Sequence, residues 1–239
     1  KETSIEDGST TAEVFNTLDE SASRTEEWVI KNQKYIFIIV GLAAVLVLGF
    51  LGFDKFIQEP KESVATNDMF QSQQYFDQAV NGTSKDSLFT LALNGADGKY
   101  GFLDIADVYS GTKAGNLSNY YAGMAYLNMK DYTNAVTYLN AFSSEDDVLG
   151  PIAKGGIGDA FVQLEQLDDA YDYYVQAAQL KSNDYTTPMY LYKAGMIGLK
   201  LGNNAKALGF FNQIKSDFPE STEAKDIEVF IGKAEAAIN

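Results

Sequence analysis

The longest run of apolar residues in the chain extends from Tyr35 to Phe53 and contains no charged side chain. A helix rises about 1.5 Å per residue, so a helix of this length covers a hydrocarbon core of about 30 Å. Lys34 precedes the run, Asp54 follows it, and aromatic residues stand near both ends, where the two interfaces of a bilayer favour them. The pattern predicts a single transmembrane helix with its membrane core at 35–53.

Two other structures also contain long apolar runs. A cleaved signal peptide has a shorter apolar region and a cleavage site of small residues behind it, whereas this run is longer and no such site follows. A buried core helix is the remaining alternative to a transmembrane helix.

The segments that flank the apolar run are polar. Ser23 to Glu26 has the spacing of a capping box, so we expect the helical segment to span 24–58 and to end before Pro60. Residues 1–23 are acidic and poor in large apolar groups, which is typical of a disordered tail. Within that tail an apolar face could form a short helix that docks on a partner, with Val14, Phe15 and Leu18.

Positive charge in the short flanks predicts the orientation of the helix in the membrane. Three cationic residues lie on the N-terminal side and two on the other: Arg24, Lys31 and Lys34 against Lys55 and Lys61. Cationic flanks are retained in the cytoplasm, so we expect a cytoplasmic N terminus and an exported C-terminal domain.

From residue 61 to 239 the sequence contains an internal repeat with a period of roughly 35 residues. Three segments, 115–148, 151–183 and 188–219, share one register. Each has a small residue, a second small residue after a turn, and a large residue four positions later: Gly123, Ala135 and Leu139; Gly158, Ala170 and Tyr174; Gly195, Ala207 and Phe211. Repeats of this length predict stacked pairs of helices.

Two further segments extend this array. FLDIADVYSGT from Phe102 aligns with FNQIKSDFPES from Phe211, which predicts a degenerate first repeat at 64–112 whose first helix is 64–80. Residues 84–99 within it are compatible with a strand, a helix or a folded loop. An amphipathic stripe predicts a capping helix at 221–238: Ile227, Phe230, Ile231 and Ala234. The predicted fold class is all-α.

The repeat register resembles the tetratricopeptide family, in its small and large positions and in Pro219, which matches the closing proline of that family. Two features depart from the family pattern. The bulky Trp position holds Asn119, Lys154 and Leu191, and the turn glycine is present only as Gly202. The resemblance implies a right-handed helical solenoid that binds other proteins.

In tetratricopeptide proteins the first helix of each pair lines a concave groove. The matching positions here are Tyr120, Met124, Asn128, Asp159, Gln163, Tyr192, Met196 and Lys200, with Leu127 and Val162 as positions that could instead pack between helices. Methionines and amphipathic rings suit an adaptable surface for apolar peptide segments. Family members that clamp a C-terminal carboxylate have Lys and Asn where this chain has Tyr120 and Met124, so the resemblance implies no clamp of that type.

Composition excludes several kinds of chemistry. The chain has 33 Asp and Glu against 18 Lys and Arg, a net charge of -15, so nucleic acid is not an expected partner. It contains neither Cys nor His, which removes thiol nucleophiles, Ser-His-Asp triads and nearly all zinc sites. The Gly-rich stretch 150–156 lacks the Gly-Lys-Ser/Thr end of a phosphate loop, and the acidic stretch 145–147 lacks the spacing of a calcium loop. We therefore expect no cofactor, no metal, no small-molecule substrate and no enzymatic activity.

The order of segments, with a short tail, one span and an acidic tetratricopeptide domain, is similar to that of the YfgM family, which are ancillary subunits of the bacterial SecYEG translocon. That resemblance implies a bacterial inner-membrane protein with a periplasmic C-terminal domain. Its implied partners are the translocon, a periplasmic chaperone or folding factor, and unfolded polypeptide. The alternative is a structural coordinator in another cell-envelope assembly, for division, secretion or outer-membrane biogenesis.

Overall fold

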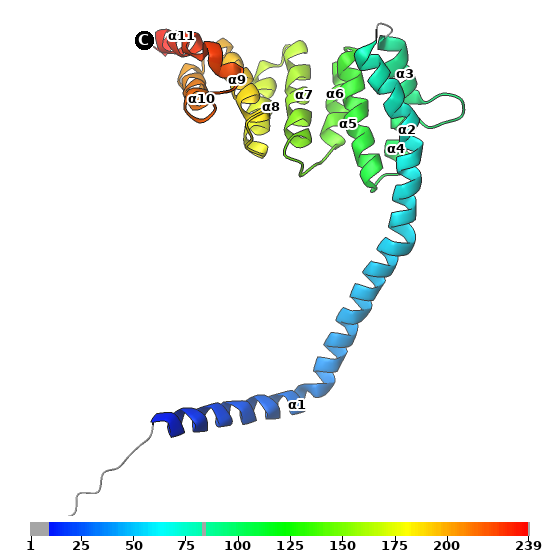
Figure 1. Cartoon of the computed structure of the whole chain (residues 1–239), viewed down its shortest axis with the longest axis vertical. Coiled ribbons are helices and arrows are strands. Elements are labelled where there is room, and N and C mark those ends of the chain that lie inside the picture. The colour runs from blue at the N-terminus through cyan, green and yellow to red at the C-terminus, as the bar shows by residue number, and fades with distance from the viewer. Residues whose placement is uncertain (1–9, 83–84, 239) are drawn as a thin grey trace, which may run out of the picture. The chain divides into compact units, whose positions relative to one another are not determined.

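The computed structural model describes residues 10–82 and 85–238, with side chains described from Glu26 onward. The chain divides into two compact units, one up to Glu59 and one from Pro60 to the C-terminal end. Throughout the described ranges the chain is helical apart from turns and short loops, and no strand occurs there (Figure 1). The all-α class predicted from the sequence is confirmed.

The first unit consists of α1 (Thr10–Phe53) and a π-helical turn, η1 (Asp54–Gln58). The predicted start near Arg24 and the predicted disorder of the whole segment 1–23 are wrong for the described part of that segment, because α1 already begins at Thr10. No Pro or Gly lies between Thr10 and Arg24, so no residue there terminates a helix, and a polar composition alone does not prevent one. The proposed short helix around Val14 lies within α1, and the side chains there are outside the described ones.

The apolar part of α1 is exposed along its length. In the hydrophobic stretch, Leu46 is 73% exposed and Phe50 is 69% exposed. The most apolar window has a mean hydropathy of 2.9, and none of that window is buried against the rest of the protein. By length and composition, this helix can cross a membrane. A core helix of a soluble protein is mostly buried, whereas no part of this window is buried in the described chain.

Pro60 does not end the helical assignment, contrary to the prediction. Helix α2 (Glu59–Asn81) follows η1 without a break and contains Pro60 as its second residue. Proline has no N–H to donate to a carbonyl of the preceding turn. The backbone N–H of Glu59, the residue before Pro60, donates to the carbonyl of Asp54 five residues earlier, which is the π-helical pattern.

The second unit begins with α2, α3 (Lys85–Asn94) and α4 (Phe102–Val108). The ambiguous segment 84–99 therefore contains a helix, followed by a tight turn. Gly95 has φ +76° in that turn, and a Cβ there would overlap the backbone from Lys99 to Gly101, so glycine is required. The core of this region is aromatic: the Phe76 ring makes edge contacts with Phe89, Phe102 and Tyr121.

Polar contacts join α2 to the start of α5 (Lys113–Asn128). The Glu62 carboxylate accepts hydrogen bonds from the backbone N–H groups of Lys113 at 2.6 Å and Ala114 at 2.9 Å. The hydroxyl of Thr112, the N-cap of α5, accepts from Gly115 N–H at 2.9 Å. The first turn of α5 thus has its unpaired donors satisfied by two separate segments.

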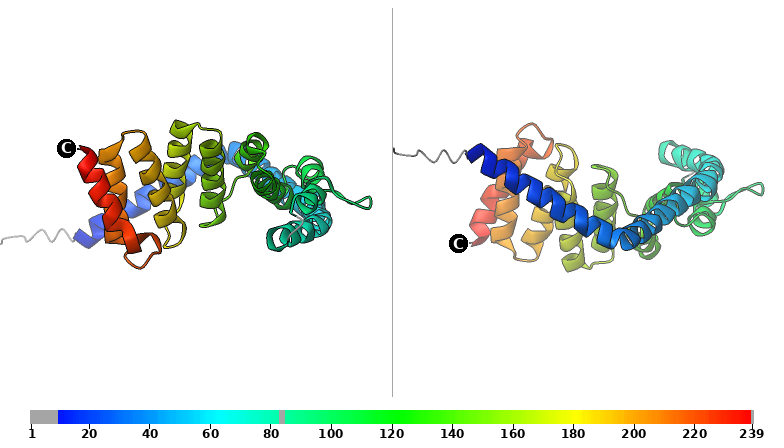
Figure 2. Two further views of the ribbon diagram at one scale, coloured as in Figure 1. Left: turned by 90° about the horizontal axis from the view of Figure 1, so that it is seen from above. Right: turned by 90° about the horizontal axis from the view of Figure 1, so that it is seen from below.

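Residues 113–217 form three helix pairs that follow one another in a row (Figures 1 and 2). They are α5 with α6 (Tyr132–Ala141), α7 (Leu149–Gln163) with α8 (Leu167–Leu180), and α9 (Thr186–Lys200) with α10 (Asn204–Asp217). Each predicted repeat contains one of these pairs.

The small residue of the repeat register lets the two helices of a pair approach closely. A Cβ added at Gly123 would lie 2.5 Å from Leu139 Cγ, and one at Gly158 would lie 2.7 Å from the Tyr174 ring. At Gly195 it would overlap the ring of Phe211. The large residue of each register therefore packs on the backbone of its partner helix, which explains why these two positions recur together.

The turn inside each pair has the same backbone in all three cases. Its middle residue has positive φ: 63° at Lys130, 60° at Glu165 and 76° at Gly202. The next N–H donates to a carbonyl five residues earlier, as from Asn203 to Gly198, and the same bond forms in the other two turns. This is the Schellman motif, which favours glycine at the positive-φ residue. Only one of the three turns has it.

The array ends with a short 3-10 turn, η2 (Glu223–Asp226), and α11 (Ile227–Ile238). Ile227, Ile231 and Ala234 are buried and belong to the same core cluster as Phe211 and Ile214. Asn204 donates to the carbonyl of Ala237 at 2.7 Å, which fixes the end of the cap on α10. The predicted C-terminal capping helix is present.

Candidate protein-binding face

The first helices of the three pairs each carry a stripe of residues at i, i+3, i+7 and i+10. All of the residues in these stripes are half-buried except Gly155, which is buried. We call this surface the first-helix face, and its members are Leu117, Tyr120, Met124 and Leu127 in α5, Ile152, Gly155, Asp159 and Val162 in α7, and Met189, Tyr192, Met196 and Leu199 in α9. The spacing places each stripe on one side of its helix. Exposed polar residues follow each stripe: Asn128, Gln163 and Lys200.

The α5 part of the first-helix face is aromatic and apolar. The Tyr120 ring centroid lies 5.3 Å from that of Phe142 and 5.7 Å from that of Tyr121. Burial raises the pKa of the Tyr120 phenol, and the adjacent Tyr121 raises it further. Met124 packs with Tyr120 on the same small core cluster. At the end of α5, the Asn128 amide donates to the Met124 carbonyl at 2.8 Å and lies exposed. This part offers apolar surface with little charge.

The α7 part differs because its functional groups are engaged by the neighbouring helices. The Asp159 carboxylate accepts from Lys193 Nζ at 2.6 and 2.8 Å and from the Tyr174 hydroxyl. Lys193 Nζ also lies 5.4 Å from the Tyr174 ring centroid and 5.6 Å from that of Tyr190. Asp159, predicted from the sequence as a binding residue, is therefore used in a contact between α7, α8 and α9.

Burial also shapes the tyrosines around this ion pair. Burial raises the pKa of the Tyr174 phenol, and the charge of Asp159 together with its hydrogen bond raises it further. The pKa of the Tyr190 phenol is raised in the same way, first by burial and then by Asp159. Tyr190 lies directly on Gly155, where a Cβ would overlap its ring. The Gly-rich stretch 150–156 thus lies inside a helix, and Gly155 allows close packing.

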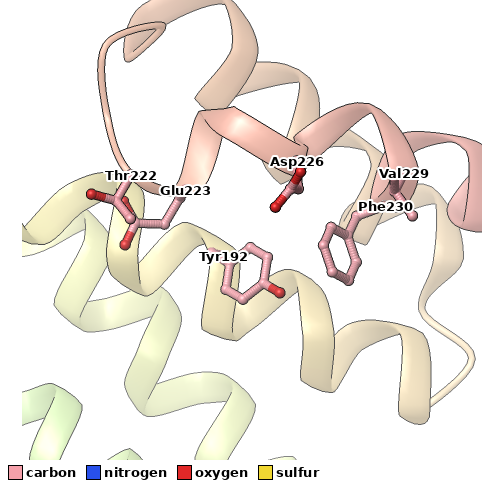
Figure 3. Close-up of a pocket in the computed structure, with 6 residues that line it drawn as sticks. All are labelled: Tyr192, Thr222, Glu223, Asp226, Val229 and Phe230. Atoms are coloured by element: carbon pink, nitrogen blue, oxygen red, sulfur yellow. The ribbon is translucent and has the colours of Figure 1, made fainter.

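The α9 part opens into a pocket of about 460 Å³ at the C-terminal end of the first-helix face (Figure 3). Its lining comes from α9, η2 and α11: Tyr192, Thr222, Glu223, Asp226, Val229 and Phe230. The Tyr192 and Phe230 rings meet edge to face with centroids 5.0 Å apart, and the buried Phe211 ring lies behind both. We call it the acidic aromatic pocket.

The predicted residues do not form one continuous site. Tyr120 and Met124 lie together on α5, and Tyr192 and Met196 lie together on α9, whereas Asp159 between them is engaged in its ion pair. Gln163 only accepts a long hydrogen bond of 3.4 Å from the Tyr132 hydroxyl. Lys200 is exposed at the end of α9.

The sequence analysis did not include the stripe residues that lie one turn before the predicted tyrosines. It also did not include the side of the acidic aromatic pocket that η2 and α11 form. The periodicity itself could have found the first group, because Leu117 and Met189 stand three positions before Tyr120 and Tyr192. Phe230 was recognised only as a core residue of the cap. Within the described residues, no group of three His, Cys, Asp or Glu side chains is close enough to hold a metal ion.

A model of the tetratricopeptide repeat matches the chain at residues 118–146 and 190–221. These segments contain most of the α5–α6 and α9–α10 pairs, and the α7–α8 pair between them has the same turn and the same glycine contact. Comparison with curated proteins gave no match, and comparison with solved structures gave none. The chain therefore contains tetratricopeptide repeats, a type of domain that generally binds other proteins.

Proposed function

We propose that this protein is a single-pass membrane-anchored scaffold that binds other proteins through the first-helix face. The observation that carries the proposal is the stripe of half-buried Tyr, Met and Leu side chains on α5 and α9, most of which pack against the core clusters and keep part of their surface exposed. Aromatic rings and thioethers supply contact area at low conformational cost and adapt to different apolar segments.

The exposed apolar helix supports the anchor. A contiguous apolar surface as long as a bilayer is thick is not tolerated in water, and lipid is the environment in which it is stable. The charge bias of the flanks supports a cytoplasmic N terminus and a tetratricopeptide domain on the opposite side of the membrane. The further assignment to a bacterial inner membrane, with this domain in the periplasm, rests on the resemblance to the YfgM family.

Replacing Leu42 and Leu46 by Lys tests the anchor. Each charge at the centre of a span costs about 2.5–3.5 kcal/mol of insertion free energy, so the double variant should leave the membrane fraction during alkaline extraction while the parent protein stays. A Leu42→Ile/Leu46→Ile variant is the control. Retention of the lysine variant in the membrane would refute the anchor.

The finer assignment is an ancillary subunit of the Sec translocation machinery that engages chaperones or emerging chains. It is supported by the similarity of architecture to the YfgM family, with one span and a tetratricopeptide domain outside the cytoplasm. A scaffold in another cell-envelope assembly would share the same architecture, so the identity of the neighbours decides between them.

Site-specific photo-crosslinking in native membranes tests both levels. A photoreactive residue at Tyr120 or Met196 should capture proteins, whereas the same residue at the exposed second-helix positions Asn140 or Gln179 should capture far fewer. Crosslinks to Sec subunits and to many secreted chains support the Sec assignment. One fixed neighbour outside that machinery supports the alternative, and equal yields from all four positions would overturn the binding role of the first-helix face.

A further inference from the structure

The acidic aromatic pocket combines an apolar floor with two carboxylates that have no partner. Tyr192 and Phe230 form the floor, and the Glu223 and Asp226 side chains stand around it (Figure 3). In the described part of the chain, neither carboxylate forms a hydrogen bond or an ion pair through its side chain. This contrasts with Asp159, where both carboxylate oxygens accept hydrogen bonds.

The two carboxylates place negative charge beside the pocket floor. Burial raises the pKa of the Tyr192 phenol, and Asp226 and Glu223 raise it further, so both carboxylates act on the pocket floor. Lys233 lies over the Phe230 ring with Nζ 4.8 Å from the centroid, and in the described part of the chain it forms no ion pair with either carboxylate. The Phe230 ring thus already has a cation on one face, and the pocket keeps its two negative charges.

We propose that the acidic aromatic pocket binds an arginine side chain presented by an extended segment of a partner polypeptide. A guanidinium stacks on an aromatic face and donates several hydrogen bonds in one plane. It can therefore lie on one of the two perpendicular rings, Tyr192 or Phe230, while it pairs with the Glu223 and Asp226 carboxylates. The volume of the pocket lies within the range of about 300–1,000 Å³ that holds small ligands and side chains. This inference rests on the proposed scaffold function and names the chemistry of its partner.

Other occupants fit the pocket less well. An acidic side chain would be repelled by both carboxylates. A purely apolar side chain would remove water from two unpaired charges without replacing their hydrogen bonds, which is costly. Because Tyr192 also belongs to the first-helix face, a bound segment can contact the Met196 side of α9 with its neighbouring residues.

Methyl NMR of the full-length protein in lipid nanodiscs gives a direct test, because Val229 lines the pocket and is 55% exposed. The probe is the blocked peptide acetyl-Gly-Arg-Gly-amide, and its neutral isostere contains citrulline in place of Arg. The Arg peptide should shift the Val229 methyl signals saturably, and the citrulline peptide should bind at least about tenfold more weakly. Equal shifts with both peptides would overturn the proposal without any variant.

A charge-matched pair of variants provides the second arm. Glu223→Gln/Asp226→Asn removes both pocket charges, and Asp107→Asn/Glu145→Gln removes two exposed charges elsewhere. The first should weaken Arg-peptide binding at least about tenfold, and the second should leave it unchanged. Unchanged binding in the pocket variant would refute the site. Crosslinking from Tyr120 in that same variant tells whether the scaffold function persists without the pocket.

Discussion

The pairs α7–α8 and α9–α10 are built on one register but use their first-helix positions differently. In α9 two adjacent stripe positions are Tyr192 and Met196, which remain half-buried. In α7 the same positions are Gly155 and Asp159, and α9 contacts both, with Tyr190 on the glycine and Lys193 on the half-buried carboxylate. A position in a repeat therefore does not by itself define a binding surface, because the next helix decides whether the group at that position is already engaged.

The two pairs also differ in how their turns are stabilised. The turn after α9 has Gly202 at the positive-φ residue, whereas the turn after α7 has Glu165 in nearly the same conformation. A side chain in this region is strained by contact between its Cβ and the backbone. The α7–α8 pair therefore keeps the same turn and the same hydrogen bonds despite an unfavourable residue at the positive-φ position.

Gly155→Ala should have the largest effect on this comparison. The new Cβ would overlap the Tyr190 ring, which is only 3% exposed and cannot move away, so we expect a loss of about 2–3 kcal/mol in unfolding free energy. Urea denaturation followed by circular dichroism measures it. Gly209→Ala on α10 is the control, because its Cβ would meet nothing within 4 Å, and it should gain about 0.5–1 kcal/mol. Similar effects at both sites would contradict the close contact between α7 and α9.

Tyr174→Phe should have a medium effect that depends on pH. At pH 7 the variant loses the hydrogen bond to Asp159, at a cost of about 1 kcal/mol. The folded-state pKa of the Tyr174 phenol is raised, so the folded state holds this proton more tightly than the unfolded state does. The parent protein therefore loses unfolding free energy as the pH rises above about 10, which is the pKa of tyrosine in the unfolded chain. The variant lacks this hydroxyl, so it does not lose that contribution.

The difference in unfolding free energy between the parent protein and Tyr174→Phe should accordingly shrink between pH 9 and pH 11. If the Tyr174 hydroxyl did not titrate in this range, the difference would stay constant. Tyr173→Phe is the control, since its hydroxyl has no hydrogen-bond partner in the described structure, and its effect should remain within about 0.5 kcal/mol. A gap that widens with pH would show that the Tyr174 proton is not retained in the fold.

Exchanging the turn residues should have the smallest effect. Glu165→Gly relieves the positive-φ strain and should raise the unfolding free energy by about 0.5–1 kcal/mol, and Gly202→Ala should lower it by a similar amount. Lys130→Gly should behave like Glu165→Gly, because its turn has the same hydrogen bonds. Thermal unfolding midpoints of the three variants check this, and a destabilised Glu165→Gly would show that the glutamate contributes a contact of its own.

The sequence predicted the features that depend on repetition. The shared register of Gly123, Gly158 and Gly195 was sufficient to predict the stacked pairs, because each glycine and its large partner meet across one pair. The apolar run from Tyr35 to Phe53 was equally sufficient for a long exposed helix. Both signals are local or periodic, so they can be read without knowing which segments meet in space.

The rest depends on contacts between distant segments. No pattern in the sequence indicates that Asp159 and Lys193 form an ion pair. Likewise, no pattern indicates that the Tyr192 and Phe230 rings are in contact. The helix at 85–94 is too short for its apolar spacing to separate it from a strand. The early start of α1 was missed because a polar segment was assumed to be disordered although it contains no helix breaker.

The Glu62 carboxylate has a practical consequence for isolating the soluble part of this protein. It caps α5 from a position only two residues after Pro60, and Ala65 and Met69 on the same helix are buried in the core that contains Phe89 and Phe102. A water-soluble fragment should therefore begin at Pro60 or earlier. A cut placed after α2, at Gly82, would uncap α5 and uncover Phe89 and Phe102, and the resulting fragment should aggregate.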